Sequence, residues 1–384
     1  MAQIEFRTHQ SIAELGPERW RRLAEGAPPP LDYRWLAALE STGCVEPSRG
    51  WLPMHVGAYQ DGELVGGSPG YIKGNSEGEF VFDHGWARFA EASLGLEYFP
   101  KWIVAVPFTP ATGPRFLTAP GADAAELERA WAQALPRFAE KLGVSGVHVL
   151  FPEPAQADLL EQSGLLRRYG VQFHWRNPGY ATLDDFLARF NSKKRNQIRR
   201  EIREMRDQAL ELDVLTGKDL RPEAVDHIFE FYVSTVDKFF YGRRYLNRAF
   251  FEQVCSVMPE RLHVVFARPM GQEVPIAGAF NLLGHDTLYG RYWGAREDRP
   301  FLHFNVCFYR GIEDAIARKL AVFEPGAGGE HKLARGFEPT LTHSAHAFTD
   351  QRLSRAIADH LARERVAIDA HVAEAKREGV LKPA

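Results

Sequence analysis

Apolar and polar positions alternate in two similar strand–turn–strand units that lie about half the chain apart. The first joins residues 55–59 (HVGAY) to 64–71, and the second joins residues 263–267 (HVVFA) to 275–283. In the first unit the apolar runs flank Asp61-Gly62, a strong hairpin signal. The repeat predicts a duplicated domain of average size. A chance match is the alternative, because hairpins are common.

Helical periodicity surrounds these strands. Apolar residues at helical spacing predict helices over 122–142, 156–168, 301–319 and 350–378, a helix that starts at Pro222, and a basic helix that opens at the capping-box sequence 182–185. Short apolar runs predict strands over 144–151 and 321–324. Strands interleaved with helices indicate an α/β fold of mixed α+β character. We expect domains over 1–175 and 176–349, followed by an amphipathic helix over 350–384.

Composition narrows the class of protein. A chain of 384 residues with 45% hydrophobic residues is long enough for two domains. Its net charge of -3 excludes a globally basic nucleic-acid coat, so anion binding must be local. Cys44, Cys255 and Cys307 lack metal-type spacing, so we predict reduced thiols and no metal. No apolar run suits a signal peptide or a bilayer span, which predicts a cytoplasmic protein without membrane insertion.

The basic helix carries the densest positive charge. Arg195, Arg199 and Arg203 recur at every fourth position and form one stripe, with Glu201 and Glu204 placed to neutralise it locally. Like charges at this spacing repel, whereas guanidinium groups bind phosphate or carboxylate at two points. The stripe therefore predicts an anionic ligand. The alternative is a solvated helix face with acidic partners elsewhere in the fold.

The second half of the chain concentrates polar and aromatic side chains. Alternation over 286–293 predicts a strand on which Tyr289, Arg291 and Trp293 share one face. A glycine-rich turn follows at 325–329, where backbone amides suit close approach of a ligand. Next to this turn, Lys332 and Arg335 are candidates for ligand binding, and the alternative for both is a surface role. In the loop 238–245, Lys238 is a further binding candidate, and the alternative is that this loop covers the core.

Five runs together resemble the FemAB-like group of predicted N-acyltransferases, which belongs to the GNAT acetyltransferase-fold superfamily. The runs are YGVQFHWRNPGY at 169–180, FNSKKR at 190–195, YGRYWG at 289–294, FLHF at 301–304 and GEHKLARG at 329–336. The resemblance implies two tandem GNAT-like domains, each a central mixed sheet flanked by helices. It also implies an amine acceptor, such as a small molecule or peptide of peptidoglycan type, and acyl-CoA or aminoacyl-tRNA as donor. The usual CoA grip, [QR]-x-x-G-x-[GA], is matched at 291–296 except that Arg296 replaces the small residue.

Acyl transfer to an amine needs a base, and no covalent intermediate. Histidine titrates near neutral pH, so His331 or the adjacent Glu330 is the expected base, with His303 behind them. In the alternative, His331 binds a backbone carbonyl and His303 caps a helix. We therefore expect an N-acyltransferase without a tightly bound cofactor. The competing hypotheses are a non-catalytic protein that recognises peptidoglycan fragments or another anionic ligand, and an RNA-binding protein that uses the basic helix.

Overall fold

The computed structural model describes residues 3–238 and 242–382, which form two compact units. The first unit comprises Met1–Val171 and Leu341–His371, and the second comprises Gln172–Thr340 and Val372–Ala384. The chain passes between the units inside β9 (Leu166–Arg176), inside β15 (Glu338–Phe348) and inside α13 (Gln351–Arg377). The division therefore differs from the expected boundaries, which had assigned the segment 341–349 to the second domain and 350–384 to a separate helix.

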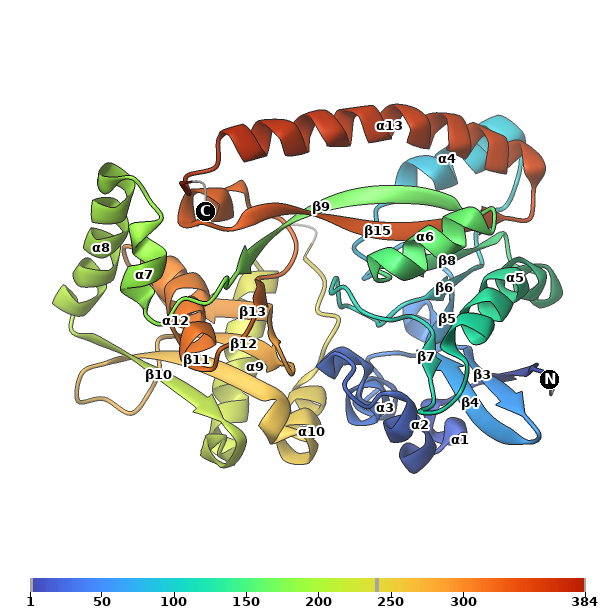
Figure 1. Cartoon of the computed structure of the whole chain (residues 1–384). Helices are drawn as coiled ribbons and strands as arrows, with labels where there is room; N and C mark the ends of the chain where they lie inside the picture. Colours follow the sequence, from blue (N-terminus) through green and yellow to red (C-terminus); the bar gives the residue numbers. More distant parts are fainter. Residues whose placement is uncertain (1–2, 239–241, 383–384) are drawn as a thin grey trace. The chain divides into compact units, whose positions relative to one another are not determined.

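The first unit contains two groups of strands (Figure 1). One group has the order β1–β3–β4–β7 and is antiparallel throughout. The other places β2, β5, β6, β8 and β15 side by side, with β6 and β8 parallel and the remaining neighbours antiparallel. The bounds are β1 Glu5–His9, β2 Trp51–Pro53, β3 His55–Gln60, β4 Glu63–Ser68, β5 Gly70–Lys73, β6 Lys101–Val104, β7 Leu117–Thr118 and β8 Gly146–Leu150.

The predicted hairpin at Asp61-Gly62 is confirmed. Both turn residues have positive φ, 49° and 84°, the conformation that a tight hairpin turn requires and that glycine adopts without strain. The helices of this unit are α1 Ile12–Leu15, α2 Pro17–Leu23, η1 Pro29–Leu31, α3 Tyr33–Ser41, η2 Pro47–Arg49, α4 His84–Leu94, α5 Ala124–Leu142 and α6 Pro154–Gln162.

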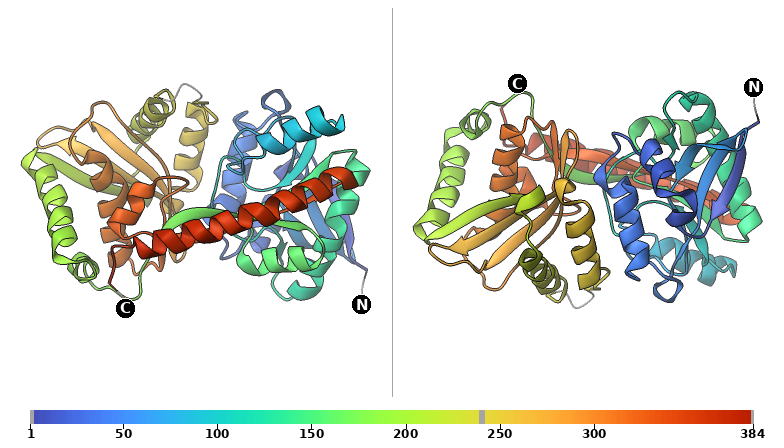
Figure 2. Two further views of the ribbon diagram at one scale, coloured as in Figure 1. Left: turned by 90° about the horizontal axis from the view of Figure 1, so that it is seen from above. Right: turned by 90° about the horizontal axis from the view of Figure 1, so that it is seen from below.

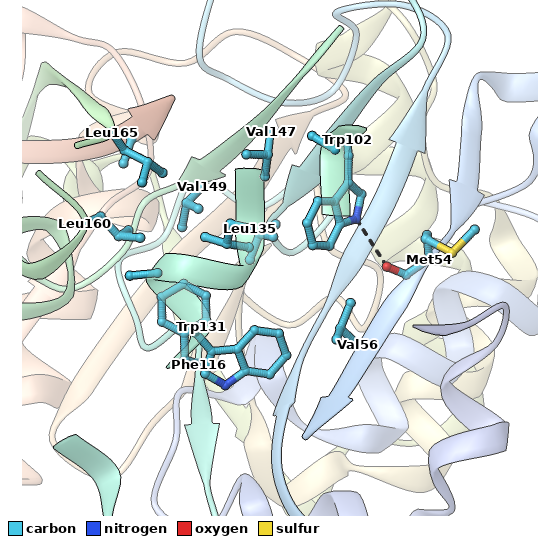
Figure 3. Close-up of a cluster of buried hydrophobic side chains, with 14 of the residues drawn as sticks. Met54, Val56, Trp102, Phe116, Trp131, Leu135, Val147, Val149, Leu160 and Leu165 are labelled. Atoms are coloured by element: carbon cyan, nitrogen blue, oxygen red, sulfur yellow. Dashed lines mark hydrogen bonds between the residues drawn. The ribbon is translucent and has the colours of Figure 1, made fainter. Parts of the chain in front are cut away.

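The core of the first unit packs α5 against the strands. Trp131 of α5 and Trp102 of β6 are fully buried among aliphatic side chains of β3 and β8 (Figure 3). The indole of Trp102 donates a hydrogen bond of 3.2 Å to the carbonyl of Met54, so the polar edge of this ring is satisfied. A second cluster joins α4 to the C-terminal helix α13 through Trp86, Leu353 and other apolar residues. The apolar stripe predicted on that helix is thus buried in the first unit.

The second unit contains one mixed sheet in the order β10–β11–β12–β13–β14–β9. Its strands are antiparallel neighbours except β13 and β14, which are parallel. The bounds are β10 Leu210–Thr216, β11 Leu262–Pro269, β12 Ala277–Leu283, β13 Thr287–Ala295 and β14 Val322–Glu324. The helices are α7 Leu183–Ala188, α8 Ser192–Asp207, η3 Gly217–Asp219, α9 Pro222–Val236, α10 Arg248–Val257, η4 Pro259–Arg261, α11 Leu302–Phe304, η5 Asn305–Tyr309, α12 Arg310–Ala317 and η6 Glu330–Arg335.

Period-two alternation places helices on both faces of this sheet (Figures 1 and 2). Phe266 of β11 and Phe280 of β12 contact aromatic rings of α9 and α10. Their neighbours Val265 and Ala279 point to the opposite face, where they pack with Leu302 and Val306 of the segment from α11 to η5. The result is a three-layer α/β/α unit, which confirms the predicted fold class.

Two predicted helices are shorter than expected. Residues 163–168 do not continue α6, because Gly164 takes a φ of 93° and β9 begins at Leu166. The basic helix does not open at the capping box of Thr182, which caps only the short α7. Asn191 starts α8 separately by accepting a hydrogen bond from the amide of Lys194.

Both units repeat one order of elements. Each has an antiparallel hairpin, then a strand that is followed by a helix and a parallel strand: β6, α5 and β8 in the first unit, and β13, α12 and β14 in the second. The parallel strand is flanked by one further antiparallel strand, β15 beside β8 and β9 beside β14. Among the described residues no helix is long and apolar enough to cross a membrane.

Candidate functional site

A β-bulge interrupts β13 at Arg291, one of the residues predicted to bind a ligand. Phe280 of β12 pairs with Tyr292, whereas the next residue, Asn281, pairs with Gly290. Arg291 is therefore the extra residue of the bulge. Bulges bend a strand and redirect its side chains, and they are frequent beside functional sites.

The bulge separates Tyr289 from Trp293. Tyr289 pairs with Leu282 and Trp293 pairs with Ala279, and residues opposite each other in a ladder share a face of the sheet. Leu282 lies on the α9 side with Phe280, whereas Ala279 lies on the opposite side. The prediction that Tyr289, Arg291 and Trp293 share one face is wrong, because one extra residue shifts the alternation. Only Trp293 joins the cluster described next.

The ring of His303 contacts both Trp293 and His331. The ring centroids are 4.4 Å apart for Trp293 and His303 and 5.6 Å apart for His303 and His331. Burial, together with the nearby His331, Arg335 and Lys332, lowers the pKa of His303 to about 4. Partial desolvation and the same two cations lower the pKa of His331, whose side chain is exposed. Both rings are therefore neutral at neutral pH, the form that accepts a proton.

Lys332 anchors the glycine-rich turn that precedes it. Its ammonium donates a hydrogen bond of 2.7 Å to the carbonyl of Gly326, and burial lowers its pKa to about 8. The side chain is 4% exposed, so Lys332 does not lie on the surface, the alternative that was considered for it, and its binding role stays a prediction. A Cβ at Gly290 would lie 2.9 Å from the Cα of Pro325, so glycine at the bulge lets this turn pack closely against β13.

Arg335 connects this turn to α8 through a buried carboxylate. One of its nitrogens lies 3.3 Å from Glu201, and another donates a hydrogen bond of 3.0 Å to the carbonyl of His331. Its guanidinium carbon stacks 3.2 Å from the ring centroid of Phe304. The hydroxyl of Tyr309 donates to the same carboxylate, and burial and this hydrogen bond raise the pKa of Tyr309. Arg335 is thus a buried positioning residue of the His331 turn.

Glu201 was predicted to neutralise the exposed arginine stripe, and that assignment is wrong. Its side chain lies on the inner face of α8 and is 1% exposed. The sequence carried a signal for this position, because Glu201 is three residues after Ile198 and four before Met205, the two apolar residues of the buried face. A lone carboxylate at a core position needs a buried partner, which Arg335 supplies.

The arginine stripe itself lies on the outer side of α8. Arg199 and Arg203 are exposed, Arg195 is half-buried, and Arg199 forms an ion pair of 2.7 Å with Asp184 of α7. Desolvation and the charge of Arg335 lower the pKa of Lys194 on the same helix. An anionic ligand for the stripe stays a prediction.

The remaining candidates surround the cluster. The ammonium of Lys238 lies 6.0 Å from the ring centroid of Trp293 and 3.8 Å from Asp298. Residues 239–241 of the same loop, and the side chain of Glu330, lie outside the part that the structure describes. Burial raises the pKa of Cys307, so this thiol is a poor nucleophile.

Comparison with known proteins identifies relatives of the whole chain. The FemAB-like family model, described as peptidoglycan biosynthesis/recognition, matches residues 11–382. No curated protein matches the chain in sequence.

Three solved structures share the fold. The C-terminal domain (DUF2156) of a putative lysylphosphatidylglycerol synthetase from Agrobacterium fabrum is 12% identical, with a TM-score of 0.55 over 92% of this chain and 97% of that one. FemX is 12% identical, with a TM-score of 0.53 over 92% and 100%. L-PGS from Bacillus licheniformis is 9% identical, with a TM-score of 0.52 over 90% and 96%. Identities this low establish a shared fold alone.

Proposed function

We propose, from the membership of this chain in the FemAB-like family of peptidoglycan biosynthesis/recognition, that it is an N-acyltransferase. In this proposal it moves an acyl or aminoacyl group onto an amine of a cell-envelope precursor. The observation that carries the proposal is the exposed, neutral imidazole of His331 beside His303 and Trp293. A base of this kind suits attack by an amine on an activated carbonyl.

The proposed step is direct. The amine nitrogen attacks the carbonyl carbon of the donor, a C–N bond forms, and His331 accepts the proton that the nitrogen loses. The tetrahedral oxyanion then collapses, and the C–S bond of acyl-CoA or the C–O bond of an aminoacyl-tRNA ester breaks. The leaving group recovers the proton. In this proposal, the backbone amides of the glycine-rich turn at 325–329 stabilise the oxyanion.

Two donors remain in the proposal, and both are polyanionic. The exposed guanidinium groups of Arg199 and Arg203 suit either one. Arg296, which replaces the small residue of the CoA grip, makes two contacts of 2.6 Å with Glu230. A guanidinium held in this position favours the aminoacyl-tRNA over acyl-CoA.

Transfer assays with the full chain test the proposal. Acyl-CoAs and charged tRNAs are offered with amine-bearing peptidoglycan peptides, and product is followed by mass spectrometry. We expect transfer by the native protein and a loss of about 100-fold or more in kcat for His331→Ala. His84→Ala, on the exposed start of α4 in the other unit, is the matched control. Ligand binding without transfer by any donor would instead support a non-catalytic binding protein.

A further inference from the structure

A cavity in the first unit is distant in sequence from every residue of the proposed active site. It has a volume of about 470 Å³ and lies between α4 and α13, which run close together in Figure 1. Cavities of this size hold small organic ligands. A Cβ built on Gly85, which lines the cavity, would meet no atom within 4 Å, so the space in front of α4 is open.

The floor of the cavity is a network of side chains that contact one another. Trp86 is 4% exposed, and the ring of His346 packs edge-on against it at 4.8 Å. The guanidinium carbon of Arg168 lies 4.8 Å from the ring centroid of Trp86. Glu364 fixes this guanidinium with two hydrogen bonds of 2.9 and 2.8 Å, and the carbonyl of Phe82 accepts a third of 2.7 Å. The charge of Arg168 is thus neutralised by Glu364 within the protein. The ring of Trp86 is already held in place to contact the ring of a ligand.

Two aromatic rings stand at the rim without full cover. Phe82 is 69% exposed and Phe89 is 37% exposed, and both line the cavity. Exposed aromatic side chains around a concave apolar floor are typical of a site that encloses an apolar group. Together with Trp86 they offer three ring faces or edges to a flat ligand, which aromatic side chains contact favourably.

Opposite charges face the cavity from α13. Asp359 and Arg363 both line it and are four residues apart, on the same side of the helix. Within the described ranges neither Asp359 nor Arg363 forms an ion pair. His360 also lines the cavity, and its Nε2 lies 3.9 Å from a carboxylate oxygen of Glu364. A carboxylate and a guanidinium at this spacing can receive an ammonium and a carboxylate of one small molecule.

We propose that this cavity binds a free aromatic α-amino acid. The ring would lie between Phe82 and Phe89 above Trp86, the ammonium would face Asp359, and the carboxylate would face Arg363. An aliphatic chain would leave the ring contacts unused, and a purely anionic or cationic ligand would leave one of the two charges unmatched. The inference does not depend on acyl transfer.

Titration calorimetry of the full chain with L-tryptophan tests the inference. N-acetyl-L-tryptophan lacks the ammonium and tryptamine lacks the carboxylate, so each should bind at least about tenfold more weakly. Asp359→Asn should remove the preference for L-tryptophan over its N-acetyl derivative. Arg363→Gln should remove the preference over tryptamine. These two variants change different preferences, which a general loss of stability would not do.

Filling the cavity provides the second arm. Gly85→Phe should abolish binding, whereas Gly85→Ala, which adds one methyl group to open space, should retain at least part of it. If Gly85→Phe fails to fold, Phe89→Ala removes a wall instead and should weaken binding. Arg355→Gln, on the exposed side of α13, is the control. Absence of L-tryptophan binding, or equal affinity for all three compounds, overturns the assignment.

Discussion

Glu201 and Arg335 form a buried ion pair, 3.3 Å apart, that links the basic helix α8 to the turn of His331. Their side chains are 2% and 8% exposed. Arg335 also donates a hydrogen bond to the carbonyl of His331, so the carboxylate, the guanidinium and the proposed base form one connected chain. The pair holds η6 in place, and its charge lies beneath the site instead of within reach of solvent.

Loss of Glu201 should therefore destabilise the protein strongly. Glu201→Ala leaves the Arg335 guanidinium buried without its carboxylate, which costs about 3–5 kcal/mol in comparable pairs. We expect the free energy of unfolding of the second unit, measured by urea titration, to fall by that order. Glu204→Ala removes a half-buried carboxylate one turn further along α8 and should change it by less than about 1 kcal/mol.

A double-mutant cycle separates the ion pair from lost packing. Glu201→Gln with Arg335→Gln should cost less than the sum of the two single substitutions, because the double variant has no unpaired charge. Additive effects would show that the two side chains do not interact.

Substitution of Lys101 should destabilise the first unit as strongly as substitution of Glu201 destabilises the second. Its ammonium is fully buried and lies 2.7 Å from Glu79 and 2.5 Å from Asp83. Lys101→Met leaves two buried carboxylates, and we expect a loss of about 3–5 kcal/mol in unfolding experiments at pH 7. Lys141→Met, at the exposed end of α5, should have little effect. The deficit of Lys101→Met should shrink as the pH falls, since protonation removes the uncompensated charge; a deficit that grows would contradict this account.

Stability should decline in acid because buried histidines stay neutral in the folded protein. Burial, and then the charge of Lys101, lower the pKa of His148 to about 3. Burial also lowers the pKa of His346, which pairs with His148 from β15. Between pH 6.5 and pH 3, His148 is protonated in the unfolded chain and neutral in the folded protein. The free energy of unfolding therefore decreases as the pH falls through this range. Each such histidine contributes a slope of about 1.4 kcal/mol per pH unit.

The dependence of the unfolding free energy on pH measures this directly. His148→Gln should flatten the slope between pH 6 and pH 4.5 by about one proton, as the linkage relation requires. His84→Gln, an exposed histidine of the same unit, is the comparison. An unchanged slope for His148→Gln would mean that His148 is protonated in the folded state.

Sequence patterns were sufficient where local physics decides the structure. Asp61-Gly62 predicted its hairpin because few residues accept positive φ, and the capping box at Thr182 formed as its spacing requires. The placement of strand β15 in the first unit could not be predicted. It depends on a pairing of His346 with His148, residues far apart in the chain, and no local pattern encodes such a partner.

The site was predictable in its members and not in its geometry. His303, His331 and Trp293 were selected by residue type and do lie together. The bulge at Arg291 was missed, because one extra residue leaves no trace in an alternating pattern read from one strand alone. The buried position of Glu201 was not predicted, because a charged residue is usually assigned to the exposed face of a helix. Its spacing from Ile198 and Met205 places it on the buried face.

The arginine stripe of α8 provides the last prediction. Arg199→Glu with Arg203→Glu should weaken binding of a polyanionic donor by about tenfold or more, since two phosphate contacts are lost and two repulsions are gained. Both side chains are exposed, and Arg199 forms an ion pair with the exposed Asp184 of α7, so the fold should persist, as circular dichroism can verify. Charged tRNA binding is measured by filter retention over a range of salt concentrations.

The matched control carries the same change in net charge on the other unit. Arg88→Glu with Arg129→Glu alters two exposed arginines of α4 and α5. If α8 binds the donor locally, the control retains native affinity and native salt dependence, whereas the α8 variant shows a shallower dependence on salt, because fewer counterions are released. Equal losses in both variants would mean that net charge, and not the stripe, attracts the donor. Unchanged affinity of the α8 variant would assign the stripe to a solvated helix face, in which Arg199 serves only its partner Asp184.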